Sequence, residues 1–257
     1  MKKVYLLTSH FPYLRGEDFL EVELAYAPKG MAVRLVPVNA LGGGTSSKRV
    51  PGGVEAAPLF SKGYPPLEKL RDSARALLRP AVWREVAFLV RSGRADAANL
   101  GALVVFCAAG ERIFRAMRRT YGAELRAAGA DACVYSFWMT KSAYAAALLK
   151  RSTGCRAVAR AHGHDLYEGP HTQPYQPMRR FLLETLDLVA TVSEAGRRHL
   201  VDRYGHADKV VAARLGTPDR GVRRPAGRAP FSPTASDWSA RSMGSTFMII
   251  PTPPPNG

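Results

Sequence analysis

Three short loops of the sequence contain side chains that could bind or activate a polar substrate. The richest is ARAHGHDLYEG, Ala159–Gly169, where His162 ends a strand-like run and His164 and Asp165 follow. A histidine at such a place can donate a hydrogen bond to a sugar hydroxyl or a phosphate, and a nearby aspartate can orient it. A histidine that caps a helix or bonds the backbone would show the same spacing. Both interpretations stay open at this point.

Two other roles for the same loop are a metal site and part of a catalytic triad. His162 and His164 are two residues apart, so both would face one side of an extended segment. No further cysteine or carboxylate stands at a convincing ligand spacing, and we expect no metal and no other cofactor. No serine lies in a G-x-S-x-G turn, which disfavours a Ser-His-Asp triad.

The other two loops could receive an anion at the start of a helix. In FPYLRGEDFLEVE, Gly16 permits close approach of a ligand to the backbone, and Glu17 opens a helix with free N–H groups. In TVSEAGRRHL, Ser193 is a natural N-cap and Glu194 suits the first turn. Ordinary strand-to-helix turns would explain both loops without a ligand, and spacing alone favours that simpler explanation.

These loops belong to a chain in which strands and helices alternate. Short apolar runs predict seven strands, over residues 3–8, 32–38, 54–59, 131–137, 155–161, 187–192 and 209–214. Helical patterns cover residues 17–29, 67–128 in two or three pieces broken near Pro80 and Gly93, 140–151, 178–184 and 194–204. Pro37 indicates an edge position for the second strand. We predict an α/β fold with a doubly wound, Rossmann-like parallel sheet, whose loops at the carboxyl ends of the strands carry the site.

Composition narrows the class of protein. The chain has 257 residues, 37 Lys+Arg, 21 Asp+Glu, a formal net charge of +16 and 46% hydrophobic residues, which excludes a wholly disordered chain. The basic excess suits a phosphorylated substrate, an acidic membrane surface or nucleic acid, although Arg-rich composition also follows from a GC-rich genome. No zinc-finger spacing or RNA-recognition motif is present, so we expect no nucleic-acid partner.

Apolar runs and cysteines indicate the compartment. The longest uncharged run, Ala97 to Gly110, is too short for a membrane span and predicts a buried helix. The first residues do not match a signal peptide. Cys107, Cys133 and Cys155 stand in apolar contexts, which favours buried thiols in a reducing cytoplasm. We therefore expect a cytoplasmic protein.

The composition changes near residue 220. Residues 220–257 are rich in Pro, Ser, Arg and Gly, show no regular period, and contain no Glu after Arg220. We predict one domain over residues 1–219 and a disordered tail over residues 220–257.

Four segments in this order resemble the N-terminal half of family 4 glycosyltransferases of the GT-B fold: FPYLRGEDFLEVEL, ARAHGHDLYEG, VSEAGRRHLVDRYG and RLGT. The resemblance covers about Lys2 to Thr217 and points to bacterial exopolysaccharide or lipopolysaccharide enzymes of the colanic-acid type. It implies a hexosyltransferase-type enzyme that moves a sugar, with retention, from a nucleotide-sugar to a polysaccharide or lipid-linked acceptor. It also implies no required metal, and peripheral contact with the inner face of the cytoplasmic membrane.

The resemblance assigns roles to residues of the three loops. His162 would be the catalytic histidine that contacts the donor sugar, and Gly16 and Glu17 would approach the donor phosphates and the acceptor. Other positions that would line the substrate cleft are His164, Asp165, Ser193, Glu194 and, at the start of the interdomain linker, Gly216.

The tail departs from this family. A donor domain with a basic pair and an E-x7-E pair should follow the linker, and residues 220–257 contain neither a domain pattern nor that pair. We expect a truncated or frameshifted glycosyltransferase that is inactive alone. The alternatives are a non-catalytic acceptor-binding module that works with a separate partner, and a basic protein of the membrane surface or of nucleic acid.

Overall fold

The computed structural model describes residues 3–13, 17–28, 30–40, 48, 50–169 and 174–216. Its elements in chain order are β1 (Lys3–Thr8), α1 (Phe19–Ala25), β2 (Ala32–Pro37), β3 (Glu55–Ala56), α2 (Pro66–Leu77), α3 (Pro80–Arg91), α4 (Ala97–Ala128), a 3₁₀ turn (Gly129–Asp131), β4 (Ala132–Ser136), α5 (Lys141–Thr153), β5 (Arg156–Ala161), α6 (Gly163–Leu166), α7 (Arg179–Thr185), β6 (Leu188–Thr191), α8 (Glu194–Tyr204) and β7 (Val210–Ala212).

All seven strands form one parallel sheet in the order β3-β2-β1-β4-β5-β6-β7. Strands β1 and β4 are buried along almost their whole length, as expected for parallel strands covered on both faces. The chain leaves β1 toward β2 on one side and returns toward β4 on the other, so the switch in strand order lies between β1 and β4. In a sheet of this kind, ligands bind in the crevice at that switch.

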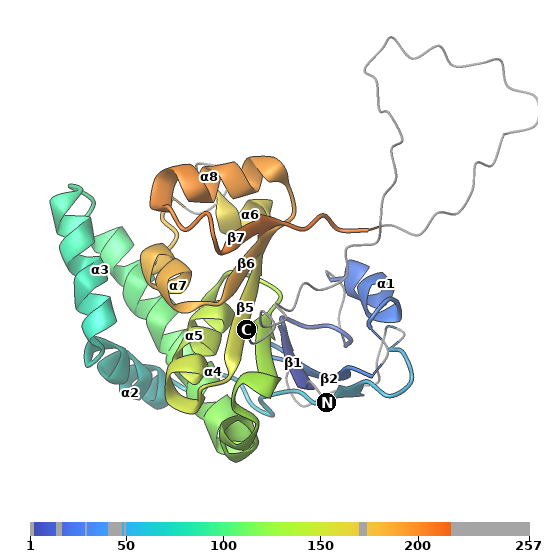
Figure 1. The fold of residues 1–257 in the computed structure, drawn as a ribbon. Helices are drawn as coiled ribbons and strands as arrows, with labels where there is room; N and C mark the ends of the chain where they lie inside the picture. Colours follow the sequence, from blue (N-terminus) through green and yellow to red (C-terminus); the bar gives the residue numbers. More distant parts are fainter. Residues whose placement is uncertain are drawn as a thin grey trace, which may run out of the picture.

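The helices cover the two faces of the sheet unequally (Figure 1). Buried side chains of α2 to α8 pack on one face in a single cluster, whereas α1 packs on the other through Leu20 and Leu24. Within the larger cluster α4 and α5 approach closely, because a Cβ at Gly110 would stand 2.4 Å from the ring of Tyr144. The alanines of α5 belong to the same cluster and are fully buried.

The predicted fold class is confirmed: the described residues form an α/β domain with a Rossmann-like parallel sheet. The predicted helical stretch 67–128 is three helices, and its breaks lie at Pro80 and next to Gly93. Pro80 begins α3, where its missing N–H costs nothing. The three cysteines are buried free thiols, as predicted.

The edge position predicted for the second strand is wrong. β2 pairs with β1 on one side and with β3 on the other, and the edge strand is β3, of two residues. Pro37 is tolerated because it is the last residue of β2, beyond the paired residues Arg34 and Leu35. The predicted tail, residues 220–257, lies outside the described residues, and so does the domain boundary at residue 219.

One helix in the described part of the chain is long and apolar enough to cross a membrane. It spans Ala97–Asp131, with a mean hydropathy of 1.4 in its most apolar window, of which 39% is buried. Leu103, Cys107 and Met117 on α4 are at most 1% exposed and belong to the main cluster. One side of α4 therefore packs in the core. The buried helix predicted for residues 97–110 is buried on that side only, because Ala97, Ala98, Gly101, Ala102 and Val105 are exposed.

Candidate functional site

Four loops meet at the carboxyl ends of the central strands, and hydrogen bonds join three of them directly. The indole Nε1 of Trp138, after β4, donates to Glu17, after β1, at 2.6 Å. The backbone N–H of Met139 donates to Asp165, after β5, at 2.5 Å. The loop after β6 adjoins them, because Gly196 packs against Leu166. The candidate site therefore stands at the topological switch of the sheet.

Glu17 shapes the first of these loops. Its carboxylate accepts the indole N–H of Trp138 and three backbone N–H groups, each at 2.9 Å, from Ser9, His10 and Phe11. The residue is 3% exposed. Four donors satisfy both oxygens, so the side chain holds the loop in place. Helix α1 begins at Phe19, two residues after the predicted start at Glu17.

Asp165 holds the loop after β5 in place. Its carboxylate accepts the backbone N–H of His162 and that of Met139, both at 2.5 Å, and the residue is 1% exposed. Burial raises the pKa of Asp165, and the neighbouring charge of Arg179 acts against that rise. The carboxylate stands 4.0 Å from Nδ1 of His162, which is too far for a hydrogen bond. Asp165 thus fixes the backbone around the histidine and not its ring.

Arg179 is the buried cation of this loop. It is 3% exposed, and its guanidinium donates to the carbonyls of Met139, at 2.8 Å, and Asp165, and to Oε1 of Gln176 at 2.9 Å. Burial lowers the pKa of Arg179 while Asp165 opposes that effect. The pair therefore ties the loops after β4 and β5 to the start of α7.

The side chain of His162 takes no part in the hydrogen bonds of Glu17, Asp165 and Arg179 described above. It is 7% exposed and lies among aromatic rings, with centroid distances of 4.3 Å to Trp138, 4.9 Å to Phe137 and 6.0 Å to Phe19. His162 is the N-cap residue of α6 and forms a capping box with Asp165. By distance and angle, however, neither ring nitrogen makes a hydrogen bond to a described residue. Burial, with a smaller contribution from Arg160, lowers the pKa of His162 to about 3. At neutral pH the ring is uncharged and offers one donor and one acceptor.

Arg160 lies behind this histidine in the sheet. It is 1% exposed, its Nη1 contacts Oε2 of Glu23 at 2.7 Å, and its guanidinium stands 5.7 Å from the ring of Phe137. Burial raises the pKa of Glu23, although Arg160 opposes the rise. A buried cation two residues before His162 thus helps to keep the imidazole neutral.

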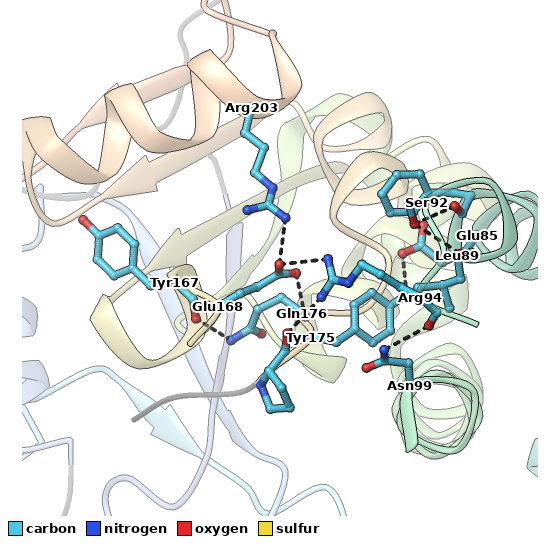
Figure 2. A network of polar contacts seen from close by, with 12 residues as sticks. Glu85, Leu89, Ser92, Arg94, Asn99, Tyr167, Glu168, Tyr175, Gln176 and Arg203 are labelled. Carbon is cyan, nitrogen blue, oxygen red and sulfur yellow. Dashed lines mark hydrogen bonds and ion pairs between the residues drawn. The ribbon is translucent and has the colours of Figure 1, made fainter. Parts of the chain in front are cut away.

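A second polar network holds the loop after β5 from outside. Figure 2 shows Arg94, from the α3–α4 loop, and Arg203, from α8, converging on Glu168. Their guanidinium nitrogens stand 3.1 and 2.8 Å from Oε2 of that carboxylate. Its other oxygen accepts the backbone N–H of Gln176 at 3.1 Å. The loop that carries His162 is therefore bound through Glu168 to both the α3–α4 loop and α8.

The remaining predicted residues have local or peripheral places. Ser193 is the N-cap of α8, with its Oγ accepting from the N–H of Gly196 at 3.0 Å, and Glu194 pairs with Arg197 at 2.7 Å. His164 is exposed, and its carbonyl accepts from Gln176. Gly216 is exposed. The prediction for Gly16 lies outside the described residues.

Sequence reasoning missed several residues of this site. Phe137, Trp138, Arg160 and Arg179 all contact the loops around His162. One available signal was the aromatic pair at the end of the fourth predicted strand, which places two rings at the carboxyl edge of the sheet. Among the described residues, no group of three His, Cys, Asp or Glu could hold a metal ion.

A family model matches more than half of the chain. Residues 85–217 match the model of Glycosyltransferase Family 4. This segment includes His162 and Asp165 but not Glu17. No curated protein sequence matches the chain.

Several solved structures have a similar shape at low sequence identity. Sucrose-phosphate synthase from Thermosynechococcus elongatus has a TM-score of 0.49 at 14% identity, over 84% of this chain and 90% of that one. UDP-N-acetylglucosamine 2-epimerase from Rickettsia bellii has 0.44 at 12%, over 84% and 45%. Anabaena HepE, solved with UDP-glucose, has 0.40 at 13%, over 84% and 44%. This chain thus spans under half the length of the last two.

Proposed function

Because this chain belongs to Glycosyltransferase Family 4, we propose that the described domain is the acceptor-side half of a retaining, hexosyltransferase-type GT-B enzyme. It would help to move a sugar from a nucleotide-sugar to a polysaccharide or lipid-linked acceptor. The observation that carries this proposal is His162, a buried neutral imidazole with both nitrogens unused, at the switch point of the sheet. A polar group left unpaired there is costly unless a ligand satisfies it.

His162 would act on the sugar as a hydrogen-bond partner and not as an acid. A ring whose pKa is about 3 holds no transferable extra proton at neutral pH. Its single N–H can donate to a hydroxyl of the transferred sugar, and the rings of Phe137 and Trp138 keep water away from that bond. Glu17 and Asp165 would support this bond indirectly, by fixing the loops on either side.

Transfer would also need groups that bind and stabilise the leaving nucleoside diphosphate. The family resemblance places them in a second domain, with a basic pair and an E-x7-E pair. No E-x7-E pair occurs in residues 1–257. We therefore propose that this half does not transfer sugar unless a donor domain is supplied, and that it works in the cytoplasm, at the inner face of the membrane, without a metal or other cofactor.

The experiment is a transfer assay with and without a donor domain. The purified chain is incubated with UDP-glucose carrying a labelled sugar and with lipid-extracted acceptors, alone and with a family 4 donor domain expressed separately. We expect labelled acceptor only in the mixture, and loss of label with His162→Ala but not with Asp202→Ala, an exposed residue of α8. Transfer by the chain alone would overturn the need for a donor domain. Acceptor binding with no transfer in any mixture would favour the non-catalytic module instead.

The frameshift hypothesis has its own test in the DNA. The tail after Arg220 is Pro- and Arg-rich and contains no Glu. If it is the product of a shifted frame, another frame downstream of the Gly221 codon should encode an α/β domain with a basic pair and an E-x7-E pair. Absence of such a frame would remove the hypothesis and leave the assignment of the described domain intact.

A further inference from the structure

Helix α2 carries its leucines on the side that faces away from the protein. Leu67, Leu70 and Leu77 recur at helical spacing and are 58%, 67% and 39% exposed, and Leu78 directly after the helix is 81% exposed. The opposite side of the helix is buried and contains Asp72, which is 0% exposed. The usual orientation of an amphipathic surface helix is therefore reversed.

Helix α3 also exposes large apolar side chains, although its buried side is mostly apolar and includes Val82 and Leu89. Trp83 and Val90, two turns apart, are 57% and 61% exposed, whereas Glu85 is 5% exposed. The indole Nε1 of Trp83 donates to the backbone carbonyl of Leu77 at 2.7 Å, which ties the Trp83 side chain to the end of α2. The exposed apolar side chains of this helix pair, here named together the α2–α3 apolar face, are Leu67, Leu70, Leu77, Leu78, Trp83 and Val90.

Arginines border this face on both helices. Arg71 follows Leu70, and Arg84 and Arg91 follow Trp83 and Val90, so each lies about 100° farther round its helix. Residues 62–94 contain eight basic and three acidic side chains. Two of those acids, Asp72 and Glu85, are buried, which leaves Glu68 as the exposed one. The border of the apolar face is therefore positive, although Arg84 stands 3.8 Å from the carboxylate of Glu184 on α7.

A hollow in the seam between α2 and α4 adds to this charge. It is lined by residues that include Lys62, Arg112, Arg115 and Arg119. It adjoins α2, because Arg115 contacts Asp72 at 2.7 Å and Arg112 stands 3.7 Å from Glu68. The structure shows no ion pair between Lys62 or Arg119 and any described residue. This basic hollow lies on the Asp72 side of α2 and adds positive charge close to the helix.

We propose that the α2–α3 apolar face docks onto the surface of an anionic lipid bilayer. Leucines would enter the boundary between head groups and acyl chains, Trp83 would lie at the interface, and the bordering arginines would contact lipid phosphates. A second copy of the chain is a poorer occupant, because two such faces would bring arginines together with few carboxylates between them. All of the face except Val90 precedes residues 85–217, so the family match does not account for it.

Vesicle sedimentation of the full-length chain tests this proposal without any sugar transfer. We expect the chain to sediment with phosphatidylcholine vesicles that contain phosphatidylglycerol and not with phosphatidylcholine alone. Arg71→Gln and Arg84→Gln should each weaken binding about fivefold, and Leu70→Asp with Leu78→Asp should abolish it. Trp83 emission should shift to the blue on binding, and Trp83→Phe should remove that shift.

Matched variants control for charge and exposure. Tyr26→Asp changes a side chain that is 55% exposed at the end of α1, on the other face of the sheet, and Arg198→Gln removes an exposed arginine of α8. Both should bind like the wild type. Equal binding to neutral and anionic vesicles, or unchanged binding of the double aspartate variant, would overturn the proposal. So would self-association that the double variant abolishes in a protein that binds no vesicles.

Discussion

The loops around His162 and the α2–α3 apolar face differ in whether the protein itself supplies partners for their side chains. In the loops, buried charges are surrounded by partners that folding supplies: Glu17 has four donors, and Asp165 has two backbone N–H groups and a nearby Arg179. On α2 and α3 the leucines and the tryptophan are left exposed. The first region is explained by the stability of the fold. The second is not, which is why it points to something outside the chain.

The largest effect is expected where a buried charge loses its counter-charge. Asp165→Ala removes the acceptor of two backbone N–H groups and the carboxylate charge that acts most strongly on the buried guanidinium of Arg179. We expect a loss of about 3–5 kcal/mol in the free energy of unfolding, measured by urea denaturation. Asp202→Ala, on the outer surface of α8, is the control. A loss as small as that of the control would show that these loops are not held through Asp165.

Replacement of Glu17 should cost less, because its carboxylate bonds mainly to backbone groups. Glu17→Gln turns one acceptor oxygen into a donor that faces the N–H groups of Ser9, His10 and Phe11. We expect destabilisation of about 1–3 kcal/mol and, by difference fluorescence, a changed environment of Trp138. Asp18→Asn, next to it but 59% exposed at its side chain, should change neither. An unaltered Trp138 signal in Glu17→Gln would contradict the proposed shape of this loop.

His162 predicts a pH dependence of stability with a definite sign. Its pKa is about 3 in the folded protein and near 6.5 in the unfolded chain. Below pH 6.5 the unfolded chain binds a proton that the folded protein cannot bind until the pH approaches 3, so this residue lowers stability as pH falls through that window. The contribution is about 1 kcal/mol at pH 5.5.

The measurement is a series of urea denaturation curves at pH 7 and pH 5.5. His162→Gln should lose less stability than the wild type over this interval, because it removes the group that takes up the proton. The exposed variant His164→Gln should follow the wild type. If His162→Gln has the same pH dependence as the wild type, the imidazole is not buried in its neutral form and the hydrogen-bonding role proposed for it fails.

Local features of the sequence predicted the framework of this site. Parallel strands covered on both faces must be continuously apolar, so β1 and β4 could be recognised in isolation. Pro80 and Gly93 mark helix breaks through their own backbone chemistry. Ser193 was recognised as an N-cap because its partner is three residues away.

Features that depend on distant residues were not predictable in the same way. Glu17 was assigned to the substrate, but one of its donors, Trp138, is 121 positions away and becomes a neighbour only when β1 and β4 pair. β3 is two residues long and pairs with β2, which makes β2 an inner strand. That pairing could not be recognised from Pro37 alone. The outward leucines of α2 were predictable as a helical stripe, but only packing shows which way the stripe faces.

The smallest effect on stability is expected on the α2–α3 apolar face, and that small effect is the sharpest test of the comparison. Leu70→Ser and Leu78→Ser change side chains that are 67% and 81% exposed, so each should alter the free energy of unfolding by less than about 0.5 kcal/mol. Leu89→Ser, on the buried side of α3 and 0% exposed, should cost several times as much. A large loss at Leu70 or Leu78 in urea denaturation would mean that these leucines stabilise the fold itself. The apolar face would then need no membrane to explain it.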